Sequence, residues 1–200
     1  MPLVLTFSEN NPLDSTIVDE STHVPTPRYE TFTIKVTGGQ SKTTLWALAP
    51  SRSIVAEVEW ERSFKSGKIT MEGRCMEMDA LLLGGGFLSR TVRKFQLPGG
   101  RLYKWKQSGA VDLKLVDPED GSLIARSLHA KLGMFEEQRD LTLEISDRGL
   151  ASLNLILLTF LLVEHLAREQ RRASVRMNPV NNINSLNMIN TMNVINMTSI

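Results

Sequence analysis

Apolar and polar residues alternate along most of the first 145 positions of the chain. The clearest case is residues 54–60, where Glu57 and Glu59 face one side and the apolar residues between them face the other. This period of two predicts a strand with one buried face and one face in water. The segment is typical of an antiparallel sheet that covers a core.

The same pattern returns at short intervals, and turn-forming residues separate the segments. Pro98-Gly99-Gly100 predicts one hairpin loop, and residues 117–121, Asp-Pro-Glu-Asp-Gly, predict another. The glycine-broken apolar residues 81–87 are expected to form a loop that crosses between strands. The pattern predicts eleven strands, at residues 3–7, 16–18, 29–36, 43–48, 54–60, 68–72, 91–97, 101–106, 111–116, 123–129 and 141–145.

Residues 150–163 carry apolar side chains around the whole circumference of a helix. Such a helix must be enclosed by protein or by lipid. Ser146 and Asp147 suit an N-cap, and three arginines suit the C-terminal end, so we expect a helix over about residues 147–172. A sheet wrapped around this helix would bury five residues almost completely: Leu153, Ile156, Leu157, Phe160 and Leu161.

A membrane anchor is the alternative for this helix, with Arg148 and Arg168 at its two ends. The apolar run is interrupted by Ser152, Asn154 and Thr159, and it is shorter than the roughly 20 residues that span a bilayer. We therefore expect the helix to lie inside a protein core.

The last part of the chain has a different composition. From Asn178 to Asn196, asparagine recurs at every third position, and no charged residue occurs. A period of three fits neither a helix nor a strand. We therefore expect residues 1–176 to form the domain and residues 177–200 to form a disordered tail, with a self-associating segment as the alternative.

Several of these segments resemble a domain family of unknown function found in mushroom-forming fungi, the basidiomycetes. The similar segments are residues 2–8 with 11–13, residues 55–60, residues 101–106, and residues 143–164. That family is in turn similar to the tubby C-terminal, LURP-one and phospholipid scramblase group. The resemblance implies a tubby-like closed β-barrel of about eleven to twelve strands around a buried hydrophobic C-terminal helix, which agrees with the mainly β pattern.

The resemblance implies less about function. Members of the wider group bind phosphoinositides or associate with membranes, whereas the fungal family has no established activity. The chain has neither the cysteine-rich palmitoylation cluster nor the acidic calcium loop of scramblases. Lipid scrambling is therefore not expected.

Composition limits the class of protein further. The 200 residues are 42% hydrophobic and 22% charged, with a net charge of +1, which suits one globular domain with a tail. Cys75 is the only cysteine, so no internal disulfide can form, and the first residues lack a basic segment of a signal peptide. We expect a cytoplasmic monomer, peripheral to the membrane if it binds lipid.

Enzymatic and metal chemistry has little support in the sequence. His23, His129 and His165 are far apart, and no two of them have metal-ligand spacing. Cys75 has no partner cysteine and is expected to be a small buried or edge thiol, and no serine lies in a nucleophile-elbow motif. We expect no enzyme, no cofactor and no metal, with a small hydrolase as a distant alternative.

Residues 80–111 are the best candidate for a binding surface, because they contain six basic residues and no acidic one. A three-residue loop at Pro98-Gly99-Gly100 would place Lys94 opposite Lys104, and Arg93 opposite Trp105 on the other face. Like charges directly opposite each other destabilise a sheet, so a bound anion would stabilise this face. The candidate lipid or anion site is Arg90, Lys94, Lys104 and Lys106.

Three other interpretations concern these basic residues. Acidic residues from elsewhere, such as Glu57 or Glu59, could neutralise the hairpin and leave an ordinary solvated face. Nucleic acid is not expected, because the net charge is close to zero. Arg171-Arg172-Ala173-Ser174 fits a basophilic kinase motif, so Ser174 is a candidate phosphorylation site that would fray the helix end.

The sequence thus predicts a non-enzymatic intracellular module that binds an anionic membrane surface or phosphoinositide. The alternative is a protein-interaction or structural scaffold without affinity for lipid.

Overall fold

The computed structural model describes residues 1–61, 66–84, 92–97, 100–108, 111–128 and 141–177. The chain divides into two units, Met1–Leu166 and Ala167–Ile200. The first unit contains the whole sheet and the first part of the long helix. The second unit is described only for the last turns of that helix, where Arg172 forms an ion pair with Glu169 at 2.7 Å. The Asn-rich tail lies outside the described residues.

Twelve strands and two α-helices make up the described elements. The strands are β1 (Leu3–Phe7), β2 (Ser15–Asp19), β3 (Thr26–Lys35), β4 (Ser41–Ala47), β5 (Ser53–Trp60), β6 (Gly67–Met71), β7 (Arg74–Glu77), β8 (Val92–Gln96), β9 (Leu102–Ser108), β10 (Asp112–Val116), β11 (Leu123–Leu128) and β12 (Thr142–Ile145). The helices are α1 (Met78–Leu81) and α2 (Leu153–Met177), with short 3₁₀ turns η1 (Thr37–Gly39) and η2 (Asp147–Ser152).

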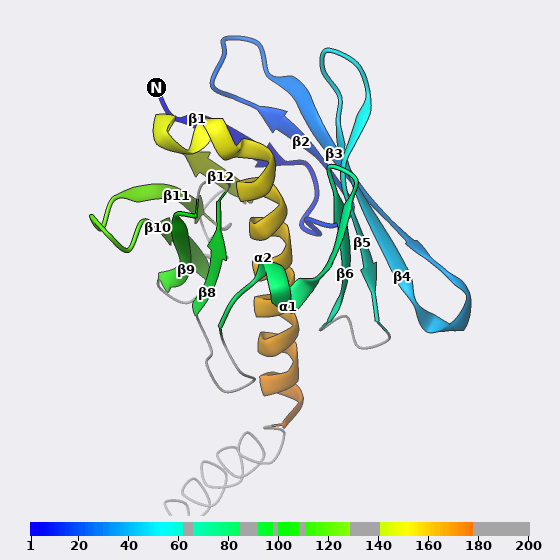
Figure 1. Cartoon of the computed structure of the whole chain (residues 1–200). Coiled ribbons are helices and arrows are strands. Elements are labelled where there is room, and N and C mark those ends of the chain that lie inside the picture. Colours follow the sequence, from blue (N-terminus) through cyan, green and yellow to red (C-terminus); the bar gives the residue numbers. More distant parts are fainter. Residues whose placement is uncertain (62–65, 85–91, 98–99, 109–110, 129–140, 178–200) are drawn as a thin grey trace, which may run out of the picture. The chain divides into compact units, whose positions relative to one another are not determined.

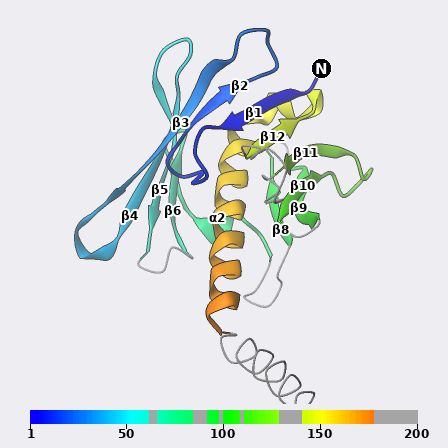
Figure 2. The same cartoon turned by 180° about the vertical axis from the view of Figure 1, so that it is seen from behind.

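All twelve strands belong to one antiparallel sheet, in the order β7-β6-β5-β4-β3-β2-β1-β12-β11-β10-β9-β8. The first and last strands, β1 and β12, pair in the middle of this order. Within the first unit the sheet curves around the N-terminal part of α2, with β2–β6 on one side and β8–β11 on the other (Figures 1 and 2). The helix is therefore the common core of both halves.

The described ladder has β7 at one end and β8 at the other. An isolated bridge joins Leu83, just after α1, to Lys94 of β8 through two backbone hydrogen bonds of 2.7 and 2.9 Å. The segment that leaves β7 therefore touches β8 at one point. We call the boundary between β7 and β8 the seam. A full ladder across the seam, as in a closed barrel, stays a prediction.

The eleven predicted strands are confirmed, and the sequence missed one strand and one short helix. β7 pairs with β6 after a tight turn at Glu72 and Gly73, whose φ angles are 52° and 72°. Glu72 is an uncommon residue in this left-handed region, so the usual turn signal was absent. Cys75 lies in β7 as an exposed free thiol, in agreement with the predicted edge position.

The inner face of the sheet packs against α2. All five helix residues predicted to be buried are confirmed, with exposed fractions of 8% or less. Phe160 packs between Phe7 of β1 and Trp105 of β9, with ring centroids 5.7 Å apart in both pairs. The Trp105 indole N–H also donates to the Thr159 hydroxyl at 3.1 Å. Enclosure by both halves of the sheet explains why this helix is apolar all round.

The start of the helix differs from the prediction. Residues Asp147–Ser152 form the 3₁₀ turn η2, the α-helix begins at Leu153 and ends at Met177, and Ser146 makes no side-chain cap. Gly149 is enclosed in η2, since a Cβ atom there would lie 2.7 Å from Ile145 Cγ2. This close packing against β12 favours the tighter turn.

Length and composition alone would allow residues Asp147–Ala173 to cross a membrane, but the core helix of a soluble protein passes the same test. Ile156 and Leu157 are fully buried within the first unit. Burial by the sheet therefore accounts for the apolar surface without a bilayer.

Candidate functional site

The β8–β9 hairpin has the predicted register. Phe95 lies opposite Tyr103, Arg93 opposite Trp105, and Lys94 opposite Lys104. The Leu97 N–H donates to the Arg101 carbonyl at 2.8 Å and closes the loop. The hairpin therefore has one face toward the core and one lysine-bearing face toward solvent.

Aromatic side chains fix the inner face of this hairpin. Phe95 and Trp105 are fully buried, and Phe95 meets the edge of Tyr103 with ring centroids 6.0 Å apart. Trp105 connects the hairpin to α2 through Phe160 and Thr159. The outer face thus lies on a closely packed support, and packing of this kind holds the side chains of a binding surface in place.

The outer face extends the lysine surface onto a third strand. Lys106 of β9 lies directly opposite Lys114 of β10, just as Lys94 lies opposite Lys104. The side chains of Lys94, Lys106 and Lys114 are exposed, and that of Lys104 is half-buried. We call these four residues, Lys94, Lys104, Lys106 and Lys114, the lysine row.

The lysine row is electrostatically uncompensated within the described part of the chain. Cβ atoms of directly opposite residues lie about 4.5–5.5 Å apart, and like charges at that distance repel. No carboxylate of the described residues lies within 4.0 Å of these four ammonium groups. Two repulsive pairs thus lie side by side on one face.

The acidic residues considered from sequence are occupied elsewhere. Glu57 of β5 forms an ion pair with Lys42 at 2.8 Å. Glu59 lies opposite Lys42 on one side and Lys68 on the other. Among the described residues, no ion pair joins Glu57 or Glu59 to a lysine of the hairpin, so the idea that these two acids neutralise it is wrong.

A compensated arginine borders the lysine row. Arg126 of β11 lies opposite Lys114, and its guanidinium binds the Glu144 carboxylate of β12 at 2.6 Å. The hydrogen bond from Arg126 to Glu144, followed by their Coulombic attraction, raises the pKa of Arg126. The uncompensated surface therefore ends between β10 and β11.

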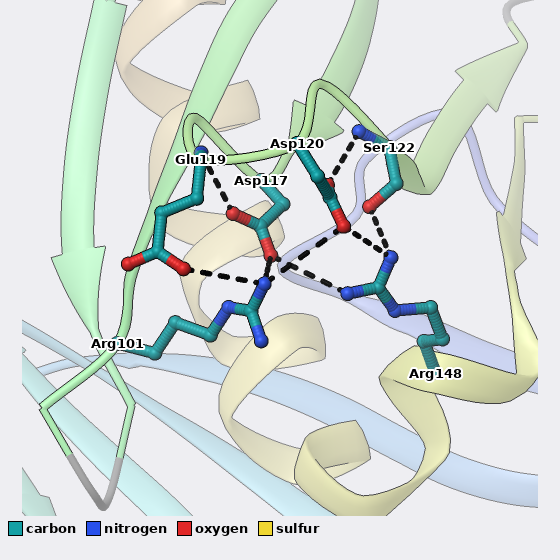
Figure 3. A network of polar contacts seen from close by, with 6 residues as sticks. All are labelled: Arg101, Asp117, Glu119, Asp120, Ser122 and Arg148. Atoms are coloured by element: carbon teal, nitrogen blue, oxygen red, sulfur yellow. Dashed lines mark hydrogen bonds and ion pairs between the residues drawn. The ribbon is translucent and has the colours of Figure 1, made fainter.

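Arg101 belongs to a different environment from the lysines, although the sequence grouped them together. Its guanidinium lies 2.5 Å from the fully buried carboxylate of Asp117 and 3.4 Å from Glu119. These acids lie just beyond the acid-free segment and reach back from the β10–β11 turn (Figure 3). Arg101 is therefore neutralised by neighbouring carboxylates.

The same turn binds the start of η2. Arg148 donates to Asp120 at 2.8 Å and to the Ser122 hydroxyl at 2.6 Å, and it lies 3.6 Å from Asp117 (Figure 3). Hydrogen bonds from the Ser122 side chain and backbone, and then from Arg148, hold the pKa of Asp120 well below its usual value. This network joins three distant segments and has a structural explanation without any ligand.

The remaining predicted residues are not placed by the structure. Arg90 lies outside the described residues, and Ser174 lies in α2 beyond the last side chain that is described. Lys114 is the residue that sequence reasoning missed. Its alternation with Leu113 and Leu115 was visible, but its pairing depends on the β9–β10 register, which no turn motif revealed. Among the described residues, no cluster of His, Cys, Asp and Glu could hold a metal ion.

Comparison with known proteins identifies a family but no characterised relative. Searches of curated proteins and of solved structures found no match. A family model described as a family of unknown function, DUF6593, matches residues 10–169. The match includes the lysine row, the β10–β11 turn with Asp117, Glu119 and Asp120, which we call the acidic turn, and the first part of α2. Because it covers most of the chain, the protein belongs to this family of unknown function, DUF6593.

Proposed function

We propose that this protein is a non-enzymatic module that binds an anionic membrane surface through the lysine row. The proposal rests on two cross-strand lysine pairs, Lys94 with Lys104 and Lys106 with Lys114. The lysines of each pair repel each other, and attraction to a negatively charged surface would offset that repulsion. Each exposed cation near an anionic membrane contributes about 1 kcal/mol of binding free energy.

The shape of the support favours a flat, multivalent anion over a small buried one. The four lysines lie on adjoining strands of one outer face, and nothing in the described part encloses them. An extended layer of lipid headgroups can contact all of them at once. Within this proposal, a phosphoinositide is the specific lipid that we expect the lysine row to bind, because its headgroup carries a high negative charge.

The resemblance to the tubby-like group supports this function by analogy. A strongly curved sheet around a C-terminal helix is the arrangement that this resemblance implies, and members of that group bind phosphoinositides or membranes. We extend the proposal to a tubby-like closed barrel, a basidiomycete origin and a cytoplasmic, peripheral location.

A protein-interaction scaffold is the second candidate, and a different surface favours it. Phe32 and Ile34 of β3 and Ile54 of β5 are exposed by 58%, 46% and 52% on the other half of the sheet. Exposed apolar side chains that gather on one face are typical of protein contacts. This candidate requires no affinity for lipid.

Liposome co-sedimentation at low and high salt tests the proposal. The Lys94→Glu, Lys104→Glu, Lys106→Glu triple variant should lose affinity for phosphoinositide-containing vesicles by on the order of 100-fold, because three favourable contacts become repulsive. Wild-type binding should also weaken at high salt, since exposed charges are screened. The matched control carries Lys35→Glu, Arg52→Glu and Lys68→Glu, which change the net charge equally on the other half of the sheet.

The control variant should sediment with the vesicles more than the lysine-row variant does. Equal sedimentation of wild type and the lysine-row variant would reject the lipid proposal and favour the scaffold. Circular dichroism melts of both variants establish that the fold is retained.

A further inference from the structure

A cavity of about 910 Å³ lies at the seam, over the first turns of α2. Its walls come from both ends of the ladder: β6 and β7 on one side, and Leu83 with the end of β8 on the other. α1, η2, the first residues of α2, and Arg28 and Tyr29 of β3 complete the lining. The volume is in the range of sites that enclose small organic ligands, about 300–1,000 Å³.

Most residues that line the cavity have apolar side chains, although polar groups provide nearly half of the lining surface. Ile69 and Leu158 are fully buried, whereas Leu83 and Leu150 keep 40% and 42% of their surface exposed. Large apolar side chains that remain exposed in a concave site mark a place where an apolar ligand can lie.

One cationic group at this cavity has no counter-ion in the described chain. Arg28 is bound to Asp19 at 2.8 Å, but Arg74 of β7 is exposed and has no carboxylate within 4.0 Å among the described residues. Gln96, Ser152 and Asn154 add neutral polar groups to the lining, and the turn residue Glu72 adds one carboxylate. Many apolar side chains lie beside the Arg74 guanidinium, which is not within 4.0 Å of Glu72 or of any other described carboxylate. This arrangement is complementary to a long alkyl chain that ends in one carboxylate.

We infer that the seam cavity binds a long-chain fatty acid, with its alkyl chain against α2 and its carboxylate at Arg74. This site is separate from the lysine row and does not require the membrane function proposed above. The competing occupant is an extended peptide that adds to the edge of β7, where no described strand pairs. The fatty acid is favoured because the apolar side chains of the lining match an alkyl chain, and Arg74 can pair with its carboxylate.

Fluorescence titration of the full chain with a dansyl-labelled undecanoic acid, in buffer without vesicles, tests this site. We expect saturable binding in the micromolar range and displacement of the probe by palmitate. Ala80→Trp and Ala151→Trp should each weaken binding by about tenfold or more, because both alanines line the cavity and are exposed enough to accept indole without disturbing the core. Val24→Trp, in an exposed loop outside the cavity, is the matched control and should bind as wild type does.

The role of Arg74 has its own readout. Arg74→Gln should weaken displacement by palmitate several-fold while leaving displacement by the uncharged hexadecanol unchanged, whereas Lys35→Gln should change neither.

Saturable binding that both tryptophan variants leave intact would overturn the site, as would the absence of binding. Binding of a labelled apolar peptide that the tryptophan variants block, without binding of the fatty acid, would assign the cavity to a peptide and overturn the proposal. Loss of vesicle binding in the lysine-row variant with normal fatty-acid binding would show that the two sites are independent.

Discussion

The two halves of the sheet treat charge in opposite ways on their outer faces. Across β4–β7, Lys42 lies opposite Glu59, Glu59 opposite Lys68, and Lys68 opposite Glu77. The signs therefore alternate over four strands. Across β8–β10, lysine lies opposite lysine twice.

The alternating row shows what stability alone favours on such a face. Opposite charges in cross-strand pairs contribute roughly 0.2–1 kcal/mol each, and like charges cost a similar amount. The lysine row therefore lowers the stability of its own half of the sheet. Proteins often tolerate such a loss of stability at a functional site. The lysine row, which stabilises the sheet less than the alternating charges of β4–β7 do, is therefore a good candidate for a binding surface.

The largest expected effect comes from a substitution in the core that both halves of the sheet share. Leu157→Asp places a charge where the exposed fraction is 0%. We expect unfolding to become easier by about 3–5 kcal/mol. A thermal melt monitored by circular dichroism checks this, and Leu123→Asp, at a position 44% exposed, should cost less than about 1 kcal/mol. An unchanged melting midpoint for Leu157→Asp would contradict the burial of α2.

A substitution in the acidic turn should lower the free energy of unfolding by a smaller amount. Asp117→Asn keeps the shape of the side chain but removes the charge that Arg101 and Arg148 approach. We expect a loss of about 1–3 kcal/mol in the free energy of unfolding, because the contact to a buried charged group is lost. Urea titration measures this loss. Glu119→Gln is the control, since Glu119 is 70% exposed and 3.4 Å from Arg101, and equal losses in the two variants would show that burial of Asp117 is unimportant.

Charge inversion sharpens the comparison directly. Lys106→Glu turns a repulsive pair with Lys114 into an attractive one and should raise the free energy of unfolding by about 0.2–1 kcal/mol. Lys68→Glu places like charges opposite Glu59 and Glu77 and should lower it by a similar amount. Paired urea titrations at low salt measure both changes, and high salt should reduce them. Changes of the same sign would remove the basis for contrasting the two faces.

The smallest expected effect is a pH dependence at the acidic turn. The pKa of Asp120 is lower in the folded chain than its usual value of 3.8, so the folded state binds this proton less readily than the unfolded state does. Its contribution is therefore complete above the unfolded pKa and is lost as the pH falls through the folded pKa. The difference in urea midpoint between wild type and Asp120→Asn should be larger at pH 6 than at pH 3. A difference independent of pH would refute the role of the Asp120 charge.

Local patterns in the sequence were sufficient for most of the fold. Period-two alternation located eleven strands because each has one face on the core, and the absence of a polar stripe located the buried helix. β7 was missed because most of its side chains are exposed and its turn uses Glu72. The start of α2 was misplaced because Gly149 packs tightly on Ile145, a tertiary contact that no local pattern encodes.

Some features of the candidate site were also predictable from the sequence, and others were not. The hairpin register was predicted from an assumed three-residue loop at residues 98–100, and the pairing of Lys94 with Lys104 is confirmed. Lys114 and the neutralisation of Arg101 could not be predicted, because both depend on how β10 and its turn return beside the hairpin. The seam cavity depends on which strands end the sheet, and that order is a property of the whole chain.

The position of α2 at the end of the fold has a consequence for how the protein is made. During synthesis, β1–β12 emerge before the helix that covers their inner face, and β1 must wait for β12, its neighbour in the sheet. Pairing of the earliest and latest strands gives a high contact order, so folding is slow and mostly follows release of the helix segment. Until then the apolar face of the nascent sheet is open to aggregation, and chaperones that hold apolar segments are expected to act on this chain while it is translated.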